Sequence, residues 1–438
     1  MRRFFKTIKA TPILLALIFI ALFFFPSAII APAESVSNAI VTAIGLDKQE
    51  NEYEVTLLTF LSYPNQSYTE RYEIFTSTGG TLSEALTKAG LQLGKAVSLF
   101  HTHTAVVSEN LLKEDIAPAL NYLVRVASLP QSCILIGTNV ETKLFMEFVK
   151  ELDAEADLNL EELTFFNSNY VYWNDTSINS FLQGYYSPTE TSLISYMPLA
   201  ESTDDGIPID KPLQTEEGEQ GSANMESGDS GAQTGGTGSG SSGSSSGGSQ
   251  SSGQQGGQYE LINDGNEIII KKGKKVADID RDILRGLNWF SSRTTGAVLI
   301  LDDVNDENFD HAQLAYKVNQ EQIRQHFDYE NGVPVCTTSI RLFVNLTEVD
   351  ASKEELKKKN EASYISDAVR DKIEETVKSQ ISGAVDVFVQ NKTDVLEMYE
   401  HFYRAQRGQT KKFLKQIGSP DEFLSHVVFK VVVSVFPN

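Results

Sequence analysis

The stretch that decides the fold is Ala39–Asp47 (AIVTAIGLD), which is followed by Tyr53–Leu61 (YEVTLLTFL). Both runs are rich in β-branched and aromatic residues, and the polar segment Lys48–Glu52 separates them. Two such runs with a short polar connection predict a β-hairpin. We expect this hairpin to open a β-sheet.

Helices and strands alternate on the C-terminal side of the hairpin. Thr81 and Glu84 stand in a Thr-Leu-Ser-Glu capping box, which predicts a helix start, and Gly94 predicts its end. Further strands are expected at Tyr72–Thr76, Thr104–Val107 and Cys133–Ile136, and further helices at Glu109–Val124 and Glu141–Leu163. This alternation is typical of a domain that mixes α and β structure.

An export signal lies on the N-terminal side of the hairpin. Four basic residues precede thirteen uninterrupted apolar residues, and the run continues to Ala33. We expect the following residues to lie in the membrane if the segment is retained: Ile13, Leu14, Leu15, Phe19, Phe23, Phe24 and Phe25. Cleavage after Ala31-Pro32-Ala33 is the alternative. In both cases the chain from Glu34 onward works outside the cytoplasm.

The composition excludes some classes of function. The formal net charge is −22 over 438 residues, and a surface of that charge repels phosphate backbones, so we expect no nucleic-acid partner. Only Cys133 and Cys336 are present, which excludes a disulfide framework. We interpret each cysteine as a small buried residue, with one bridge or a reactive thiol as alternatives.

Residues 201–257 differ in composition from the rest of the chain. An acidic lead is followed by an almost pure Gly, Ser and Gln tract, which cannot form a core. The tract is therefore a tether or a long surface insertion. One hypothesis is that it lets the two halves of the chain move independently.

The second half also has strand and helix signals. Tyr259–Ile262 and Glu267–Lys271 flank Asn-Asp-Gly-Asn and predict a hairpin. Strands are expected at Ala297–Leu301, Ala312–Val318, Gln322–Tyr329 and Thr337–Val349 as an antiparallel meander, then helices at Glu361–Ser382 and Asp394–Ala405, and a strand buried on both faces at Val427–Val435.

The predicted fold class is α+β. We expect several small mixed α/β domains, each a largely antiparallel sheet with packed helices, behind an N-terminal membrane or signal segment. The predicted divisions are residues 1–33 (signal or anchor), 36–200 (N-terminal α/β), 201–257 (disordered linker) and 258–438 (C-terminal α+β).

No catalytic, cofactor or metal site can be assembled from the motifs. The dinucleotide and nucleophile-elbow patterns at Gly238–Gly247 lie in the Gly/Ser tract without a strand or helix beside them. His101 and His103 would share one side of a strand, but no further metal ligand is evident. We expect no enzyme activity and no cofactor.

Three stretches resemble the Ger(x)C family, the extracytoplasmic C subunits of spore nutrient germinant receptors. They are the opening hairpin; Gly80–Leu86 with His103 and Arg125 before their strands; and Gly286-Leu287-Asn288-Trp289 with the long helix into Asp386. The positions similar to the family are Gly45, Thr81, Glu84, His103, Arg125, Trp289 and Asp386. The family's lipobox cysteine is missing, because no cysteine occurs between Met1 and Asp47.

The resemblance implies a non-enzymatic receptor subunit that supports nutrient-triggered spore germination. It implies integral-membrane A-type and B-type partner subunits and a place on the outer face of the spore inner membrane. Neither the nutrient nor its contact with this subunit follows from the sequence. An exported binding or envelope-scaffold protein unrelated to germination is the alternative function, and an exported hydrolase ranks third.

Overall fold

The structure is a computed structural model that describes residues 38–60, 72–156, 160, 176–201, 259–261, 267–291, 294–350 and 364–438. The chain divides into two compact units, Met1–Leu199 with Asn263–Asn438, and Ala200–Ile262. The expected leader, residues 1–33, and residues 202–257 of the tract lie outside the described residues. In the described parts of the chain, no helix is both long and apolar enough to cross a membrane.

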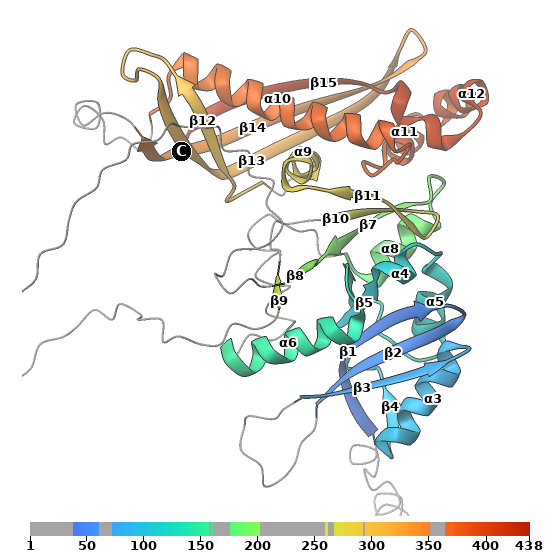
Figure 1. Ribbon diagram of the computed structural model, residues 1–438. Coiled ribbons are helices and arrows are strands. Elements are labelled where there is room, and N and C mark those ends of the chain that lie inside the picture. The colour runs from blue at the N-terminus through green and yellow to red at the C-terminus, as the bar shows by residue number, and fades with distance from the viewer. Residues whose placement is uncertain are drawn as a thin grey trace, which may run out of the picture. The chain divides into compact units, whose positions relative to one another are not determined.

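The opening hairpin is the start of a nine-stranded sheet (Figure 1). The strands follow the order β11-β10-β7-β6-β5-β1-β2-β3, with β4 beside β1. Pairs from β1 to β7 across the middle are parallel, and the pairs toward both edges are antiparallel. The elements are β1 (Asn38–Gln49), β2 (Glu52–Phe60), β3 (Tyr72–Gly79), α3 (Leu82–Leu93), β4 (Ala96–Ser98), β5 (Thr104–Ser108), α4 (Glu109–Leu112), α5 (Ala117–Arg125), β6 (Ile134–Thr138), α6 (Thr142–Ala156), α8 (Ile178–Tyr185), β7 (Thr191–Tyr196), β10 (Glu267–Lys271) and β11 (Lys274–Ile279).

Helix α3 begins and ends where its sequence predicts. Thr81 Oγ1 accepts a hydrogen bond from Glu84 N at 3.2 Å, and the Glu84 carboxylate accepts one from Gly80 N at 3.0 Å. Gly94 ends the helix with φ 62°, a left-handed conformation that glycine adopts at little cost. The capping box and the stop are confirmed.

The single helix expected at Glu109–Val124 is wrong, because the segment forms two helices, α4 and α5. Asp115 Oδ1 accepts from Ala117 N at 3.0 Å and so caps the second helix, in which Pro118 stands in the first turn. Proline is tolerated there because a first-turn amide has no partner within its own helix. Ile116 N instead donates to Gly273 O at 3.0 Å.

The hairpin expected between Tyr259–Ile262 and Glu267–Lys271 is also wrong. Strand β10 pairs antiparallel with β11 through a turn at Lys272 and Gly273, and antiparallel with β7 on its other side. Strand β9 (Tyr259–Leu261) pairs with β8 (Leu199–Glu201) in a separate two-stranded sheet. The large sheet therefore crosses the boundary predicted between residues 257 and 258.

Polar contacts tie β11 to the first half of the chain. Lys275 Nζ lies 3.0 Å from Glu109 Oε2 and 4.3 Å from the centre of the Tyr196 ring. Tyr196 OH donates to the same carboxylate at 2.9 Å. These contacts and the β7–β10 pairing contradict the hypothesis that the two halves move independently.

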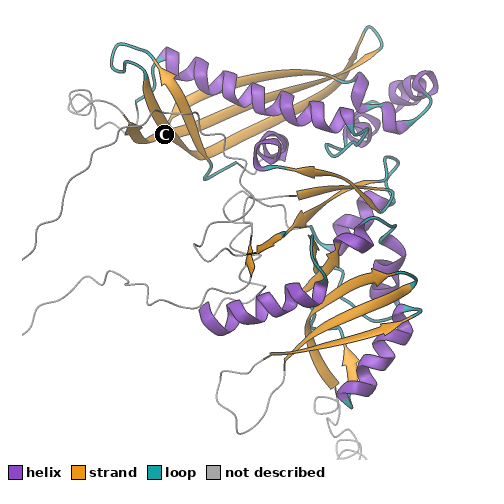
Figure 2. Ribbon diagram, in the orientation of Figure 1, coloured by secondary structure: helices purple, strands orange, loops and turns teal. Residues whose placement is uncertain are grey.

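A four-stranded sheet in the order β12-β13-β14-β15 forms the rest of the first unit (Figures 1 and 2). The first three strands form the expected antiparallel meander, and β15 joins β14 in parallel. The elements are α9 (Arg281–Ser291), β12 (Val298–Val304), β13 (Ala312–Glu330), β14 (Val333–Asp350), α10 (Asp367–Gln390), α11 (Met398–Ala405), α12 (Arg407–Ile417), η1 (Pro420–Glu422), η2 (Leu424–His426) and β15 (Val428–Pro437).

Helix α10 covers one face of this sheet. Val369, Ile373, Val377 and Ile381 recur every four residues and are buried against β12, β13 and β14, as their spacing predicts. The opposite face is open. Val432 on β15 is 53% exposed, so the expectation that this last strand is buried on both faces is wrong.

The α+β class, with helices packed on sheets, is confirmed. Two strands predicted at Ala312–Val318 and Gln322–Tyr329 are one long strand, β13, with an irregularity between Val318 and Gln320. A bulge of this kind bends a strand and shifts its alternation without ending it.

We predict that Gly286→Ala lowers the free energy of unfolding by about 1–3 kcal/mol. Helices α9 and α10 meet at this glycine, where an added Cβ would lie 2.1 Å from Gln380 O and 2.7 Å from Ala384 Cβ. The control is Gly408→Ala in α12, because a Cβ there meets nothing within 4 Å. Denaturant unfolding of both variants tests this, and equal stabilities would contradict it.

We also predict that replacing residues 205–255 with a few residues leaves one cooperative unfolding transition and raises stability by about 1 kcal/mol, since a shorter loop costs less entropy to close. The reason is that β7 and β10, on the two sides of the tract, pair directly. Thermal unfolding followed by circular dichroism measures both effects. A variant that no longer folds would show that the tract is part of the fold.

Candidate functional site

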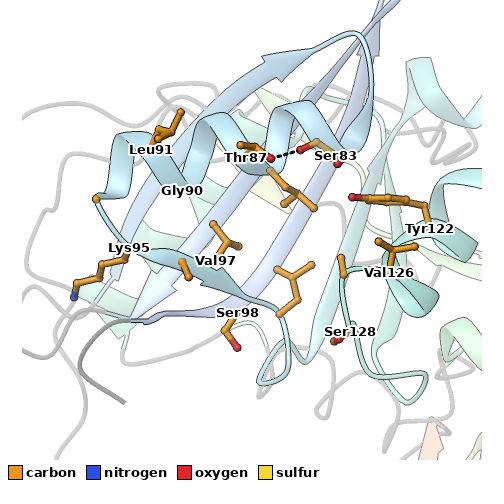
Figure 3. A pocket seen from close by; sticks show the side chains of 15 residues that line it. Ser83, Thr87, Gly90, Leu91, Lys95, Val97, Ser98, Tyr122, Val126 and Ser128 are labelled. Carbon is orange, nitrogen blue, oxygen red and sulfur yellow. Dashed lines mark hydrogen bonds between the residues drawn. The ribbon is translucent and has the colours of Figure 1, made fainter. Parts of the chain in front are cut away.

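Three adjoining hollows surround the C-terminal end of α5. The first, of about 990 Å³, lies between α3, β4 and the residues that follow α5, with Tyr122 and Val126 on the side opposite α3 (Figure 3). The second, of about 700 Å³, shares Ser128 with the first. The third, of about 550 Å³, shares Val124 and Gln131 with the second. We call the surface formed by these three hollows the α5 surface.

The α5 surface carries the four most exposed large apolar side chains of the described residues. They are Leu91 (78% exposed), Phe100 (68%), Val126 (65%) and Tyr186 (64%). Leu91 and Val126 line the first hollow, Phe100 the second and Tyr186 the third. Exposed apolar side chains gathered around concave surface are typical of an interaction site.

The charge of this surface differs from that of the chain as a whole. Residues 85–108 and 116–140, which form most of it, contain no Asp or Glu, although the chain has 59 acidic residues. Lys95 and Arg125 are exposed in the first and third hollows. The acidic residue that lines the third hollow, Glu400, forms an ion pair with Arg404 at 2.5 Å. The surface is therefore weakly basic on a strongly acidic chain.

Backbone contacts with β1 hold the segment between β4 and β5 in place. Thr102 is buried, and its Oγ1 donates to Val41 O at 3.1 Å. His103 N donates to Thr42 O at 2.9 Å, and His103 O accepts from Ile134 N at 2.8 Å. These bonds fix the backbone after Phe100, and the pairing of β4 with β1 fixes it before Phe100, so the ring is presented on a rigid support.

The turn after α5 shapes the rim shared by the first two hollows. Ser128 adopts φ 59°, and Leu129 N donates to Leu123 O at 3.0 Å across the helix end. A left-handed residue within a few positions of a helix end turns the chain away from the helix, although glycine is the usual choice. The turn leaves Val126 exposed and returns Leu129 to the core.

Cys133 lines the second hollow but is not reactive there. The residue is 1% exposed, and burial raises the pKa of its thiol to about 12. Cys336 is likewise buried, and burial also raises the pKa of its thiol. Both cysteines are free, so the interpretation as small buried residues is confirmed over a bridge or a reactive thiol.

The structure brings two of the predicted positions onto the α5 surface. His103 is exposed in the second hollow, and Arg125 is exposed in the last turn of α5, in the third hollow. His101 lies in the turn before β5, and its ring contacts the Phe100 ring edge-on at 5.4 Å between centroids. His101 and His103 therefore do not share a strand face, contrary to the expectation.

Three further predicted positions, Gly45, Thr81 and Glu84, lie away from the α5 surface. They decide how closely a helix packs or where a helix begins. A Cβ on Gly45 would lie 2.5 Å from Thr142 Cβ, so this position lets α6 pack closely on β1. Asp47, two residues on, is fully buried and accepts from Thr142 N at 2.8 Å at the start of the same helix. A carboxylate at a helix N-terminus satisfies a free amide and favours the helix dipole.

Trp289 and Asp386 lie on the two helices that cross at Gly286. Trp289 is 1% exposed, and its Nε1 donates to Gln380 Oε1 at 2.8 Å. Asp386 is exposed on α10. The residues expected in the membrane, Ile13 to Phe25, lie outside the described part of the chain.

The described residues contain no group of three or more His, Cys, Asp or Glu side chains able to hold a metal ion. The acidic loop after β12 has internal partners instead: Asp303 pairs with His311, and Asp306 Oδ2 accepts from Tyr364 OH and Ser366 Oγ. Its carboxylates therefore stabilise the loop.

The four exposed apolar residues were not predicted from the sequence. Leu91 falls outside the face formed by Leu82, Ala85 and Ala89, which are the residues α3 buries. The available signal was the absence of carboxylates from residues 85–108 and 116–140 together with apolar residues off the core face.

Comparison with known families gives two matches that follow each other along the chain. Residues 34–199 match the family "Spore germination protein N-terminal domain". Residues 264–436 match the family "Spore germination B3/ GerAC like, C-terminal". No curated protein matches the chain.

Among solved structures, the chain is similar to the crystal structure of the GerBC protein. The two share 14% sequence identity with a TM-score of 0.46. The match covers 90% of this chain and 96% of that chain.

We predict that neither native cysteine reacts with a thiol reagent at pH 7.5 in the folded protein, because both thiols are buried and remain protonated. After unfolding in denaturant, two thiols per chain should react. Mass spectrometry after exposure to iodoacetamide counts them. Labelling of Cys133 without unfolding would show that the second hollow opens to it.

Proposed function

Because the chain belongs to the Ger(x)C family of spore germination proteins, we propose that it is a non-enzymatic, extracytoplasmic subunit of a germinant receptor complex. In this role it supports spore germination in response to small nutrients. The observation that carries the proposal is that an N-terminal and a C-terminal spore germination model match in the family's order, over residues 34–199 and 264–436.

The geometry supports a role in association. The most prominent feature of the described surface is a set of exposed apolar side chains around three hollows, and the buried thiol in the second hollow is not a nucleophile. Such a surface binds another molecule without acting on it. The partners that we propose are the integral-membrane A-type and B-type receptor subunits.

The place of action that we propose is the outer face of the spore inner membrane. The support is the basic lead and the apolar run up to Ala33, which is long enough to cross a bilayer as a helix. We propose that this segment is retained and anchors the chain, since the family's lipid-bearing cysteine is missing from residues 1–47.

We predict that spores lacking this chain and its paralogues fail to germinate with nutrients but still respond to a receptor-independent stimulus. The full chain should restore nutrient germination. A version with residues 1–33 exchanged for a cleavable export signal should not restore it, because the released protein is no longer held at the membrane. Loss of refractility measures each response.

Purification in mild detergent from sporulating cells is the control for assembly. A-type and B-type subunits should copurify with a chain that still contains residues 13–25. Normal nutrient germination in the deletion strain would overturn the proposed function. Recovery of the chain alone, beginning at Glu34, would overturn the retained anchor and favour a released binding protein.

A further inference from the structure

The first hollow lies beside the point where the chain enters the fold. Strand β4 pairs in parallel with the first residues of β1, with Ala96 opposite Asn38 and Ser98 opposite Ile40. Leu91 lies in the last turn of α3, Lys95 directly precedes β4, and Phe100 follows β4 by two residues. We call Leu91, Lys95, β4 and Phe100 the β4 edge.

The predicted anchor keeps this edge close to the membrane. The apolar run ends at Ala33, and β1 begins at Asn38. Five Cα-to-Cα steps span at most about 18 Å. If the anchor is retained, Asn38 therefore lies within about 18 Å of the end of the apolar run. The β4 edge is close to the bilayer surface as well, because β4 pairs with β1 at Asn38.

The chemistry of the β4 edge matches such a neighbour. Leu91 and Phe100 are 78% and 68% exposed, and Lys95 is exposed between them along the chain. The segment from Ala85 to Ser108 contains no carboxylate that anionic headgroups would repel. Apolar side chains with neighbouring amines are the combination that binds anionic membrane surfaces.

Lys88 adds little to the positive charge that Lys95 gives the β4 edge. Lys88, on the turn of α3 before Leu91, forms an ion pair with Glu84 at 2.8 Å, so its charge is largely balanced. Lys95 forms no ion pair within the described residues. We expect the apolar contacts to dominate and the charge to select anionic lipid.

We propose that the β4 edge rests on the surface of an anionic phospholipid bilayer and inserts Leu91 and Phe100 between the headgroups. This inference rests on the proposed function, because it requires the retained anchor. It adds a second lipid contact that fixes the orientation of the folded chain on the membrane, which one point of attachment does not.

The test places a fluorescent probe at residue 91 or at residue 100 of the full chain. Leu91→Cys and Phe100→Cys are labelled with an environment-sensitive dye, and the unsubstituted chain reports any background from the native cysteines. Ile300→Cys and Val432→Cys are the matched controls, because these apolar residues are 55% and 53% exposed in the second sheet. Each protein is reconstituted into phosphatidylcholine vesicles with or without 30% phosphatidylglycerol.

Nitroxide-labelled lipid should quench the probes at residues 91 and 100 at least twofold more than those at residues 300 and 432. The quenching should be stronger with phosphatidylglycerol and should fall with added salt, because salt screens the attraction. Equal quenching in neutral vesicles would overturn the selection of anionic lipid.

Flotation of the vesicles separates this inference from the proposed function. If the chain does not float with the vesicles, the retained anchor is wrong and the inference falls with it. If it floats but the probes at residues 91 and 100 are not quenched, the inference alone is overturned. Protection of these probes from aqueous iodide only when A-type or B-type subunits are present would identify the edge as a protein interface and also overturn it.

Discussion

The antiparallel pairing of β7 with β10 is the constraint on which the rest of the first unit depends. It joins Thr191–Tyr196 to Glu267–Lys271 in one sheet, although a long tract separates them along the chain. Ile268 and Ile270 on β10 are buried in the core beneath the first helices, whereas Ile269 is buried in a cluster with residues of α9, α10 and α11. Because successive side chains of a strand point to opposite faces, one strand contributes to both cores. The ion pair between Lys271 and Asp421 at 2.8 Å reinforces the second of these contacts.

Local signals in the sequence predicted the parts of the fold that local interactions decide. The capping box at Thr81 and the stop at Gly94 are set by backbone groups within one or two helical turns, and both are confirmed. The apolar spacing of α10 likewise predicted its buried face. Gly286 and Trp289 are among the positions that resemble the family, and the structure gives them a physical role in the contact between α9 and α10.

Nonlocal pairing decided the parts that the sequence did not predict. Strand β10 has a glycine-containing segment on each side along the chain, and its pairing with β11 and β7 depends partly on a contact formed across the tract. The break between α4 and α5 depends on Gly273, whose carbonyl accepts from Ile116 N. The α5 surface was missed for a related reason, since periodicity identifies side chains that are buried and says little about which exposed ones gather together. Of the predicted positions, His103 and Arg125 lie on that surface, while Gly45 and Trp289 are buried structural residues.

The pairing of β7 with β10 also sets the order in which the chain is able to fold. Ser195 and Glu267 face each other across about 70 intervening residues, so closing this contact is slow compared with forming the opening hairpin. Until Glu267–Lys271 has paired with it, β7 presents an unpaired edge on that side. An exposed edge of this kind readily pairs with the wrong strand. The folding chain therefore passes through a stage that is prone to strand mispairing, and early pairing of the second half with β7 shortens that stage.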